Sequence, residues 1–367
     1  MRSSTTSLLL VLAGLTVGCG KPITNGSEDV VAKDPYSRPK EVGTVELLGV
    51  MMVANFNELP LQGEIHDQGR YWSGDYWQHN RGSINRRWYT AVPVGFDTVS
   101  PGRDAVASMG LEALKELAPS EKYDLLMGRY DYPLKKEVTR LARRTAKDWE
   151  GLCHGWAPAT LNHREPEPKT LTNPHGIEIP FGSSDIKALL TYYYAYHSGG
   201  KSSQIGKRCY KDAPAAGTEL QQETDQCNDD LDPGLFHIVL ANKVGLKGES
   251  FLADMDRYRE VWNHPIVTFT SKVLSESVNR KKVRTLTVNT QLYYVDEKEE
   301  NFWTPTIGTS EHVTTHKSYD YQLDVDADGK ILRGRWISAD RPDFVWSLKR
   351  PERFEGYFLR IEDLLTE

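Results

Sequence analysis

The stretch that decides the fold is Lys147–Leu161, KDWEGLCHGWAPATL, which places Cys153 between glycines and aromatic residues. Pro158 fits the first turn of a helix and is unfavourable deeper in it, because proline lacks the N–H donor. We therefore expect a helix to begin at or next to Trp156, with Cys153 at its N-terminal end. Backbone N–H groups at such an end lower the pKa of a thiol. A buried, inert cysteine fits the same pattern, so the stretch alone leaves both roles open.

Outward from this stretch, helices come first and strands follow. Apolar residues recur at helical spacing in residues 110–128 and 134–150, and residues 183–198 predict a helix that is capped by Ser184. Later segments alternate or are rich in β-branched and aromatic residues, which predicts strands. These segments are residues 234–242, 248–255, 284–295, 319–337 and 343–349. The order predicts an α+β fold rather than alternating βαβ units.

The amino terminus predicts export. Residues 8–17, LLLVLAGLTV, are too short for a membrane span but suit the core of a signal peptide. The following TVGCGK resembles the site at which bacterial lipoproteins are cut and lipidated, so we expect a lipid on Cys19; ordinary secretion is the alternative. The net charge of −6 gives no electrostatic reason to expect nucleic acid as a partner.

Export changes how the four cysteines are interpreted. Cys209 and Cys227 flank a polar loop, and in an oxidising compartment they are expected to form a disulfide; two free thiols are the alternative. If Cys19 is lipidated or removed, Cys153 is the odd cysteine, either buried and inert or reactive. No cysteine and histidine spacing typical of zinc is present, so we predict no metal site.

A nucleophilic cysteine needs a base, and His237 is the candidate because it interrupts the apolar segment LFHIVLAN. We expect this segment to be a strand that turns back at Gly245-Leu246. In that register Asp254 lies opposite His237, and a slip of the turn brings Asp256 there instead. The predicted triad is Cys153, His237 and Asp254, with Asp256 as the second choice of acid.

Several separated blocks then resemble one family. The blocks are LCHGWAPATL, FGSSDIKALLTYYYA, PGLFHIVLANKVGL, EVWNHPI and GRWISADRPDFVW. In their order they resemble the transglutaminase elicitor family of papain-like, calcium-responsive transglutaminases, over about residues 60–350. The resemblance implies a papain-like core with a β-rich C-terminal part, and it puts Cys153, His237 and Asp254 in the roles of nucleophile, base and acid. His264 stands where the family often has glutamine.

The resemblance implies acyl transfer to and from protein substrates that carry glutamine and lysine or other primary amines. The Cys153 N–H is a candidate oxyanion donor, Trp156 and Trp262 are candidates for the oxyanion site or tunnel wall, and packing is the alternative for these tryptophans. No cofactor is required for this chemistry, although the family's behaviour allows calcium. An exported cysteine protease or cell-wall amidase, and a non-catalytic surface binding protein, remain alternatives.

These interpretations divide the chain into five segments. They are a signal peptide with Cys19 (1–19), a tether (20–58), an N-terminal accessory region (59–145), a catalytic core (146–275) and a β-rich C-terminal region (276–367). The DVDADG motif at Asp324–Gly329 begins like a calcium loop, but Arg335 stands where the loop requires glutamate. We therefore expect a hairpin turn at this motif.

Overall fold

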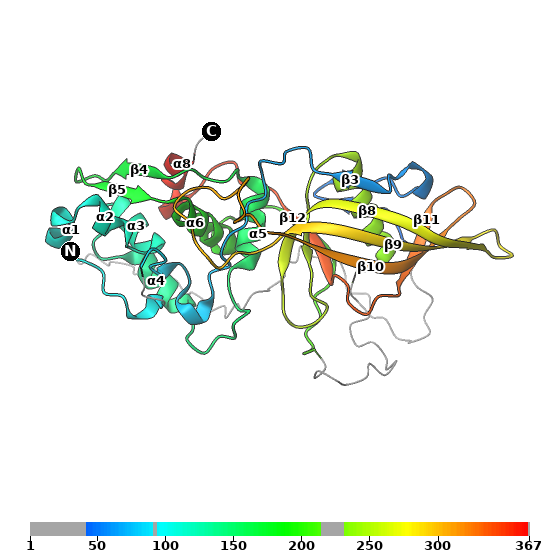
Figure 1. Cartoon of the computed structure of the whole chain (residues 1–367), viewed down its shortest axis with the longest axis horizontal. Helices are drawn as coiled ribbons and strands as arrows, with labels where there is room; N and C mark the ends of the chain where they lie inside the picture. Colours follow the sequence, from blue (N-terminus) through cyan, green and yellow to red (C-terminus); the bar gives the residue numbers. More distant parts are fainter. Residues whose placement is uncertain (1–41, 91–93, 214–230, 366–367) are drawn as a thin grey trace, which may run out of the picture.

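The computed structural model describes residues 42–90, 94–213 and 231–365. The molecule is elongated, with a helical half at one end and a long twisted sheet at the other (Figure 1). The helical half contains six helices and a small hairpin, with a short C-terminal helix beside them. These elements are α1 (Arg103–Ser108), α2 (Leu111–Lys115), α3 (Pro119–Leu126), α4 (Pro133–Leu141), α5 (Cys153–Asn162), β4 (Lys169–Thr172), β5 (Glu178–Phe181), α6 (Ser183–Tyr196) and α8 (Ile361–Leu364).

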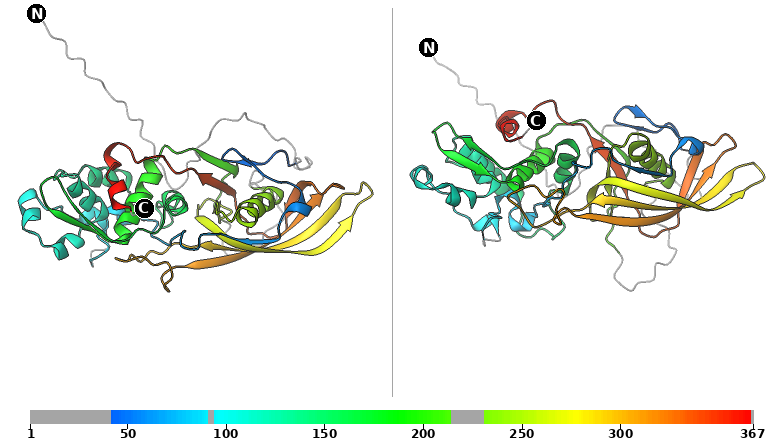
Figure 2. Two further views of the ribbon diagram at one scale, coloured as in Figure 1. Left: turned by 90° about the horizontal axis from the view of Figure 1, so that it is seen from above. Right: turned by 45° about the horizontal axis from the view of Figure 1, so that its top comes forward.

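The other half is built on an eight-stranded sheet with the path β11-β10-β9-β8-β7-β12-β6, in which β3 also pairs with β8. All of its strand pairs are antiparallel. The strands are β3 (Gln62–Glu64), β6 (Ser202–Gly206), β7 (Leu252–Asp254), β8 (Asn263–Val278), β9 (Arg284–Val295), β10 (Thr314–Val325), β11 (Ile331–Trp336) and β12 (Phe344–Leu348). Figure 2 shows β8, β9 and β10 extending away from the helices as one curved ribbon.

The α+β class predicted from the sequence is confirmed, and several elements match closely. The predicted strand at 284–295 is β9, and the predicted strands at 248–255 and 343–349 contain β7 and β12. The DVDADG motif forms the turn between β10 and β11, where the Asp326 N–H donates to the Lys330 carbonyl (3.0 Å). The predicted helix at 134–150 stops at Leu141, and residues 142–150 are a loop that leads into α5.

One predicted strand is wrong. Residues 234–242 are helical, since α7 runs from Pro233 to Leu240 and continues as a π-helical turn, Ala241–Leu246. The Asp232 carboxylate caps α7 by accepting the N–H of Gly234 (2.6 Å), and Pro233 occupies the first turn. α7 packs against β10 and β11 and is apolar nearly all round, so its sequence shows no helical period. The predicted hairpin at Gly245-Leu246 therefore does not exist.

Two expectations about domain organisation also change. The described part of the predicted tether, residues 42–58, forms β1 (Glu46–Leu47) and β2 (Val50–Met51), and Val42 and Val45 are buried in the core of the sheet half. The predicted boundary at 275/276 falls inside β8, which pairs with β9 over most of its length. The predicted catalytic core and the predicted C-terminal region therefore contribute strands to one sheet.

The two halves are built around two large hydrophobic cores. One fills the space around α3, α5 and α6, and the other lies between α7 and the sheet. The central strand β7 contributes to both, because Leu252 lies in the helical core and Ala253 in the sheet core. Alternate residues of a strand face opposite sides, so Asp254 shares the face of Leu252, toward the helices. The candidate site lies on this face, where the halves meet.

Candidate active site

Cys153 is the first residue of α5, as the sequence predicts, although the helix starts three residues before Trp156. Its thiol is fully buried and donates to the carbonyl of Val261 (3.2 Å). Tyr76, Trp149 and Trp262 pack around it. The N–H groups in the first turn of a helix have no acceptor within the helix, so Cys153 sits at the positive end of the α5 dipole. This position favours the thiolate over the thiol.

Two glycines bring α5 to this position. A side chain on Gly151 would collide with the carbonyl and ring of Tyr76, and one on Gly155 would collide with the carbonyl of Thr191 in α6. The Leu152 N–H donates to the Tyr76 carbonyl, which fixes the segment before the helix. Pro158 lies inside α5 and deprives it of one intrahelical hydrogen bond. Close packing on α6 therefore compensates for a helix that is weak in itself.

Asn263, which sequence analysis did not single out, is the polar side chain beside the thiol. Its amide nitrogen lies 3.8 Å from the Cys153 sulfur. The amide oxygen accepts the indole N–H of Trp346 (2.7 Å), which fixes the amide so that its NH2 group faces the sulfur. An N–H donor stabilises a thiolate by a charge-assisted hydrogen bond. Only tertiary structure reveals this role, because 110 positions separate the two residues.

Asp254 lies one strand away, directly opposite Asn263 in the β7–β8 pair. Facing residues of neighbouring strands have side chains on the same side of the sheet. The Asp254 carboxyl therefore lies on the same side of the sheet as the Asn263 amide. Its Oδ1 accepts the N–H of Trp262 (2.8 Å), and its Oδ2 is buried without a hydrogen-bond partner among the described residues. Burial raises the pKa of Asp254 well above its usual range. Burial therefore favours the protonated form of this carboxyl.

Asp256, the second choice of acid, lies in the loop after β7. Its carboxylate accepts the N–H of Tyr258 (2.6 Å), and burial raises its pKa less strongly than that of Asp254. Of the two candidate acids, only Asp254 faces Asn263 across a strand pair.

The structure does not bring His237 to Cys153, which corrects the predicted triad. His237 is on α7, where its Nδ1 is hydrogen-bonded to the Tyr321 hydroxyl (2.8 Å) and its ring stacks on Phe56. The Tyr321 hydroxyl continues through Thr290 to Ser271, by two hydrogen bonds of 2.7 Å.

Ser271 lies eight positions along β8 from Asn263, which corresponds to about 26 Å at the rise of a strand. The three hydrogen bonds that link Ser271 to His237 span too short a distance to bring His237 back to Asn263 and Cys153. Burial lowers the pKa of His237 to about 4, and its Nε2 has no hydrogen-bond partner among the described residues. His237 is therefore a buried, neutral core histidine and does not contact Asp254.

Three other histidines are also buried. His79 and His163 are buried, and burial lowers the pKa of His163 to about 3. His264 is buried beside Asp296 and Glu297, the cluster among the described residues that could hold a metal ion.

Of the tryptophans proposed to line the site, Trp262 lies against the thiol and Tyr76, and its indole N–H donates to Glu260 (3.0 Å). Trp156 is fully buried, and its indole N–H has no hydrogen-bond partner among the described residues. Its backbone N–H donates within α5 to Leu152, so that group is not available to an oxyanion.

The cysteine assignment is supported where it can be described. Cys153 is buried and forms no disulfide, and Cys209 is in a disulfide. Its predicted partner Cys227 and the predicted lipidation site Cys19 lie outside the described residues. Among the described residues, no helix has both the length and the hydropathy needed to cross a bilayer.

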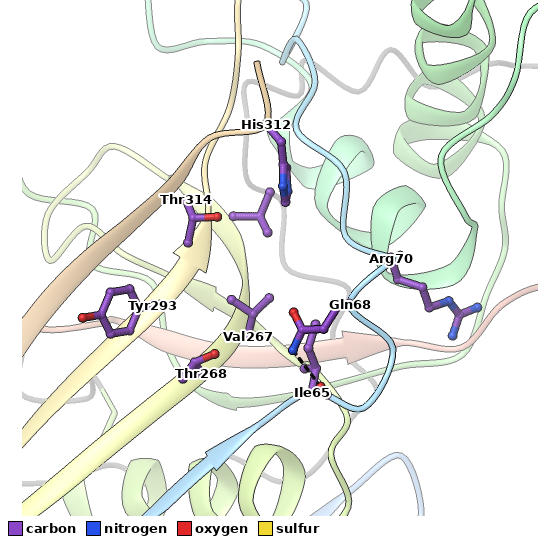
Figure 3. Close-up of a pocket in the computed structure, with 9 residues that line it drawn as sticks. Ile65, Gln68, Arg70, Val267, Thr268, Tyr293, His312 and Thr314 are labelled. Carbon is purple, nitrogen blue, oxygen red and sulfur yellow. Dashed lines mark hydrogen bonds between the residues drawn. The ribbon is translucent and has the colours of Figure 1, made fainter. Parts of the chain in front are cut away.

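A separate cavity of about 320 Å³ opens on the sheet (Figure 3). Apolar side chains of β8 and β9 form its floor, and the polar side chains of Gln68, Arg70 and His312 stand at its edge. Cys153 is not among the residues that line it.

Comparison with known proteins identifies the family of the chain. The sequence model described as transglutaminase elicitor matches residues 135–354, which include Cys153, Asp254 and Asn263. The chain belongs to the transglutaminase elicitor family. The resemblance seen in the sequence blocks is thereby confirmed.

One solved structure supports the fold of this family member. The crystal structure of the GP42 transglutaminase from Phytophthora sojae superimposes with a TM-score of 0.63 and 21% sequence identity, covering 86% of this chain and 93% of that chain. At this identity the likeness shows a shared fold. A search of curated proteins gave no significant match.

Proposed function

We propose that this transglutaminase elicitor family member is a protein-glutamine γ-glutamyltransferase and that Cys153 is its nucleophile. The observation that carries the proposal is the position of the thiol at the start of α5, beside the amide of Asn263. Family membership and the shared fold support it. The proposed substrates are proteins that present a glutamine side chain, with a lysine or another primary amine as acceptor.

In the proposed reaction, the Cys153 thiolate attacks the γ-carboxamide carbon of glutamine. The C–N bond breaks, ammonia leaves with an added proton, and a thioester remains on the enzyme. A lysine amine then attacks the thioester, forming an isopeptide bond and releasing the thiol. Water in place of the amine yields glutamate, so the balance between crosslinking and deamidation depends on how well the site excludes water.

The residues near Cys153 fit separate parts of this reaction. The resting thiol donates to the Val261 carbonyl, and the Asn263 amide and the α5 N-terminus stabilise the thiolate once the proton leaves. Asp254 is the proposed acidic group, because burial raises its pKa and lets it hold a proton that could move to the leaving ammonia. His237 has no part in the proposal, because its ring is hydrogen-bonded to Tyr321 and stacked on Phe56, away from Cys153.

The direct test is incorporation of a fluorescent primary amine into a glutamine-containing protein. We expect the wild-type chain to incorporate the amine, Cys153→Ala to lose incorporation, and the matched core variant His237→Phe to keep it. Cleavage of the substrate without amine incorporation would instead indicate a cysteine hydrolase. If Cys153→Ala keeps every measured activity, the non-catalytic binding protein is the better interpretation.

Export and lipidation at Cys19 belong to the proposal as predictions, since residues 1–41 lie outside the described structure. Mass spectrometry of the N-terminal peptide from membrane and soluble fractions tests both.

A further inference from the structure

Three side chains of types that bind metal ions lie close together, outside the proposed catalytic residues. His264 is the second residue of β8, and Asp296 and Glu297 directly follow the end of β9. One ligand atom from each lies within 4.8 Å of the others. The ring of His264 packs edge-on against Trp156, one helical turn after Cys153.

The hydrogen bonding of His264 turns one ring nitrogen toward a carboxylate. Its Nδ1 lies 3.1 Å from the carbonyl oxygen of Val295, and since a carbonyl can only accept, Nδ1 carries the hydrogen. In the neutral ring, Nε2 is then an acceptor, and it lies 3.5 Å from Oε2 of Glu297. Both side chains are more than nine-tenths buried. The ring nitrogen and the carboxylate oxygen thus face each other as two buried potential metal ligands.

A histidine that binds a metal ion through Nε2 commonly has its Nδ1–H held by a backbone carbonyl, as the Val295 carbonyl holds that of His264. The ammonium group of Lys317 is engaged with Asp340 (2.8 Å) and the Met255 carbonyl (2.8 Å).

The distances suit a small transition-metal ion. Ligands of tetrahedral zinc are about 3.3 Å apart when each lies about 2.0–2.1 Å from the ion, and the Nε2–Oε2 separation is 3.5 Å. The Asp296 carboxylate lies 3.6 Å from Nδ1 of His264 rather than beside Nε2. Because its side chain is about one-third exposed, it has room to move toward the ion and leaves a solvent path. Calcium prefers oxygen ligands, whereas imidazole suits zinc and its neighbours.

We propose that His264, Asp296 and Glu297 form a binding site for one divalent transition-metal ion of the zinc class, with solvent completing its coordination. A metal there ties the start of β8 to the segment after β9. Since His264 directly follows Asn263, the metal also fixes the strand end that carries the amide facing Cys153. The site rests on its own geometry and does not depend on the proposed transferase activity.

The experiment uses the full chain in a Cys153→Ser background, so that the thiol cannot bind the metal. After removal of metal with EDTA, we expect one equivalent of Zn²⁺ to bind and to raise Tm, and Co²⁺ to give the visible absorption of a low-symmetry site. His264→Gln and Glu297→Gln should each weaken Zn²⁺ binding at least about tenfold. His316→Gln, at an exposed histidine on β10, should leave Zn²⁺ binding unchanged.

Circular dichroism and Tm without metal establish that each variant is folded, and Glu297→Gln preserves side-chain shape if His264→Gln is unstable. The proposal is overturned if the Cys153→Ser chain binds no Zn²⁺ at micromolar concentration, or if both ligand variants bind it as tightly as their parent. Displacement of Zn²⁺ by equimolar Ca²⁺ would overturn the assignment of the ion class. None of these measurements requires catalytic activity.

Discussion

The amide nitrogen of Asn263, on β8, lies 3.8 Å from the sulfur of Cys153, and Trp346 on β12 holds that amide in place. A polar side chain thus reaches the thiol from β8, where β12 holds it, rather than from the segment that carries Cys153. This relationship predicts how the thiol will titrate and react.

Asn263→Ala should raise the pKa of the Cys153 thiol and slow its alkylation by iodoacetamide about tenfold or more at pH 7. The reason is the loss of a donor to a charged group, which contributes about 1.5–3 kcal/mol. The rate of alkylation measured against pH gives the thiol pKa directly. An unchanged pH profile would show that the amide does not stabilise the thiolate.

Asp254→Asn and Asp256→Asn form a matched pair. Asparagine resembles the protonated carboxyl that burial favours at position 254, so the fold should survive. We expect amine incorporation to fall about a hundredfold in Asp254→Asn, through loss of a proton donor, and to change little in Asp256→Asn. Equal losses in both variants would contradict the assignment of the acid.

His237→Ala should destabilise the protein without changing thiol reactivity. The substitution leaves a cavity beside Phe56 and removes the partner of the Tyr321 hydroxyl, which costs about 3 kcal/mol or more. Urea denaturation measures the loss, and iodoacetamide labelling of Cys153 under native conditions should proceed at the wild-type rate. A slower labelling rate would restore His237 as a candidate base.

The same histidine predicts a pH effect. The pKa of His237 is about 4 in the folded chain, below the ordinary value of 6.5, so the unfolded chain binds more protons as pH falls through this window. Its contribution to stability is therefore present at pH 7 and is lost progressively as pH falls from about 6.5 to 4.

Buried carboxyls act in the opposite direction, since burial raises the pKa of Asp124 to about 6. The measurement is therefore a difference between variants. From pH 7 to pH 5, His237→Phe should lose about 2 kcal/mol less unfolding free energy than the wild type. Parallel pH profiles for the two proteins would show that His237 does not stay neutral in the folded state.

Gly155→Ala should displace α5 from α6, because the added methyl group meets the Thr191 carbonyl. We expect a loss of about 1–3 kcal/mol, measured by urea denaturation, and slower alkylation of Cys153. Gly102→Ala is the matched control, since no atom lies near its added methyl group and its backbone suits alanine. A Gly155→Ala chain as stable as the control would contradict the close contact.

The sequence predicted local features of the site better than its long-range partners. Cys153 does lie at a helix start, although Pro158 lies inside α5 and not in its first turn, where the prediction placed it. The α+β order followed from periodicity. The segment around His237 failed because a short, wholly apolar run fits a buried helix and a strand equally well. The sequence Asp232-Pro233 was the missed signal, since it combines a helix cap with a proline suited to the first turn.

Asn263 could not have been predicted by the same reasoning. Its position depends on the register of β7 with β8 and on the contact with Trp346, which join residues far apart in the chain. Local propensity carries no information about such pairings. The family resemblance supplied the cysteine, whereas the tertiary structure supplied its neighbours.

The insertion of β12 between β6 and β7 has a consequence for biogenesis. Until residues 344–348 have been synthesised, Asp254 has no completed sheet around it and Trp346 is not present to hold Asn263. In a nascent chain, the Asn263 amide is consequently not yet held beside the Cys153 thiol. The surroundings of Cys153 are therefore completed only once a segment nearly two hundred residues further along the chain has joined the sheet.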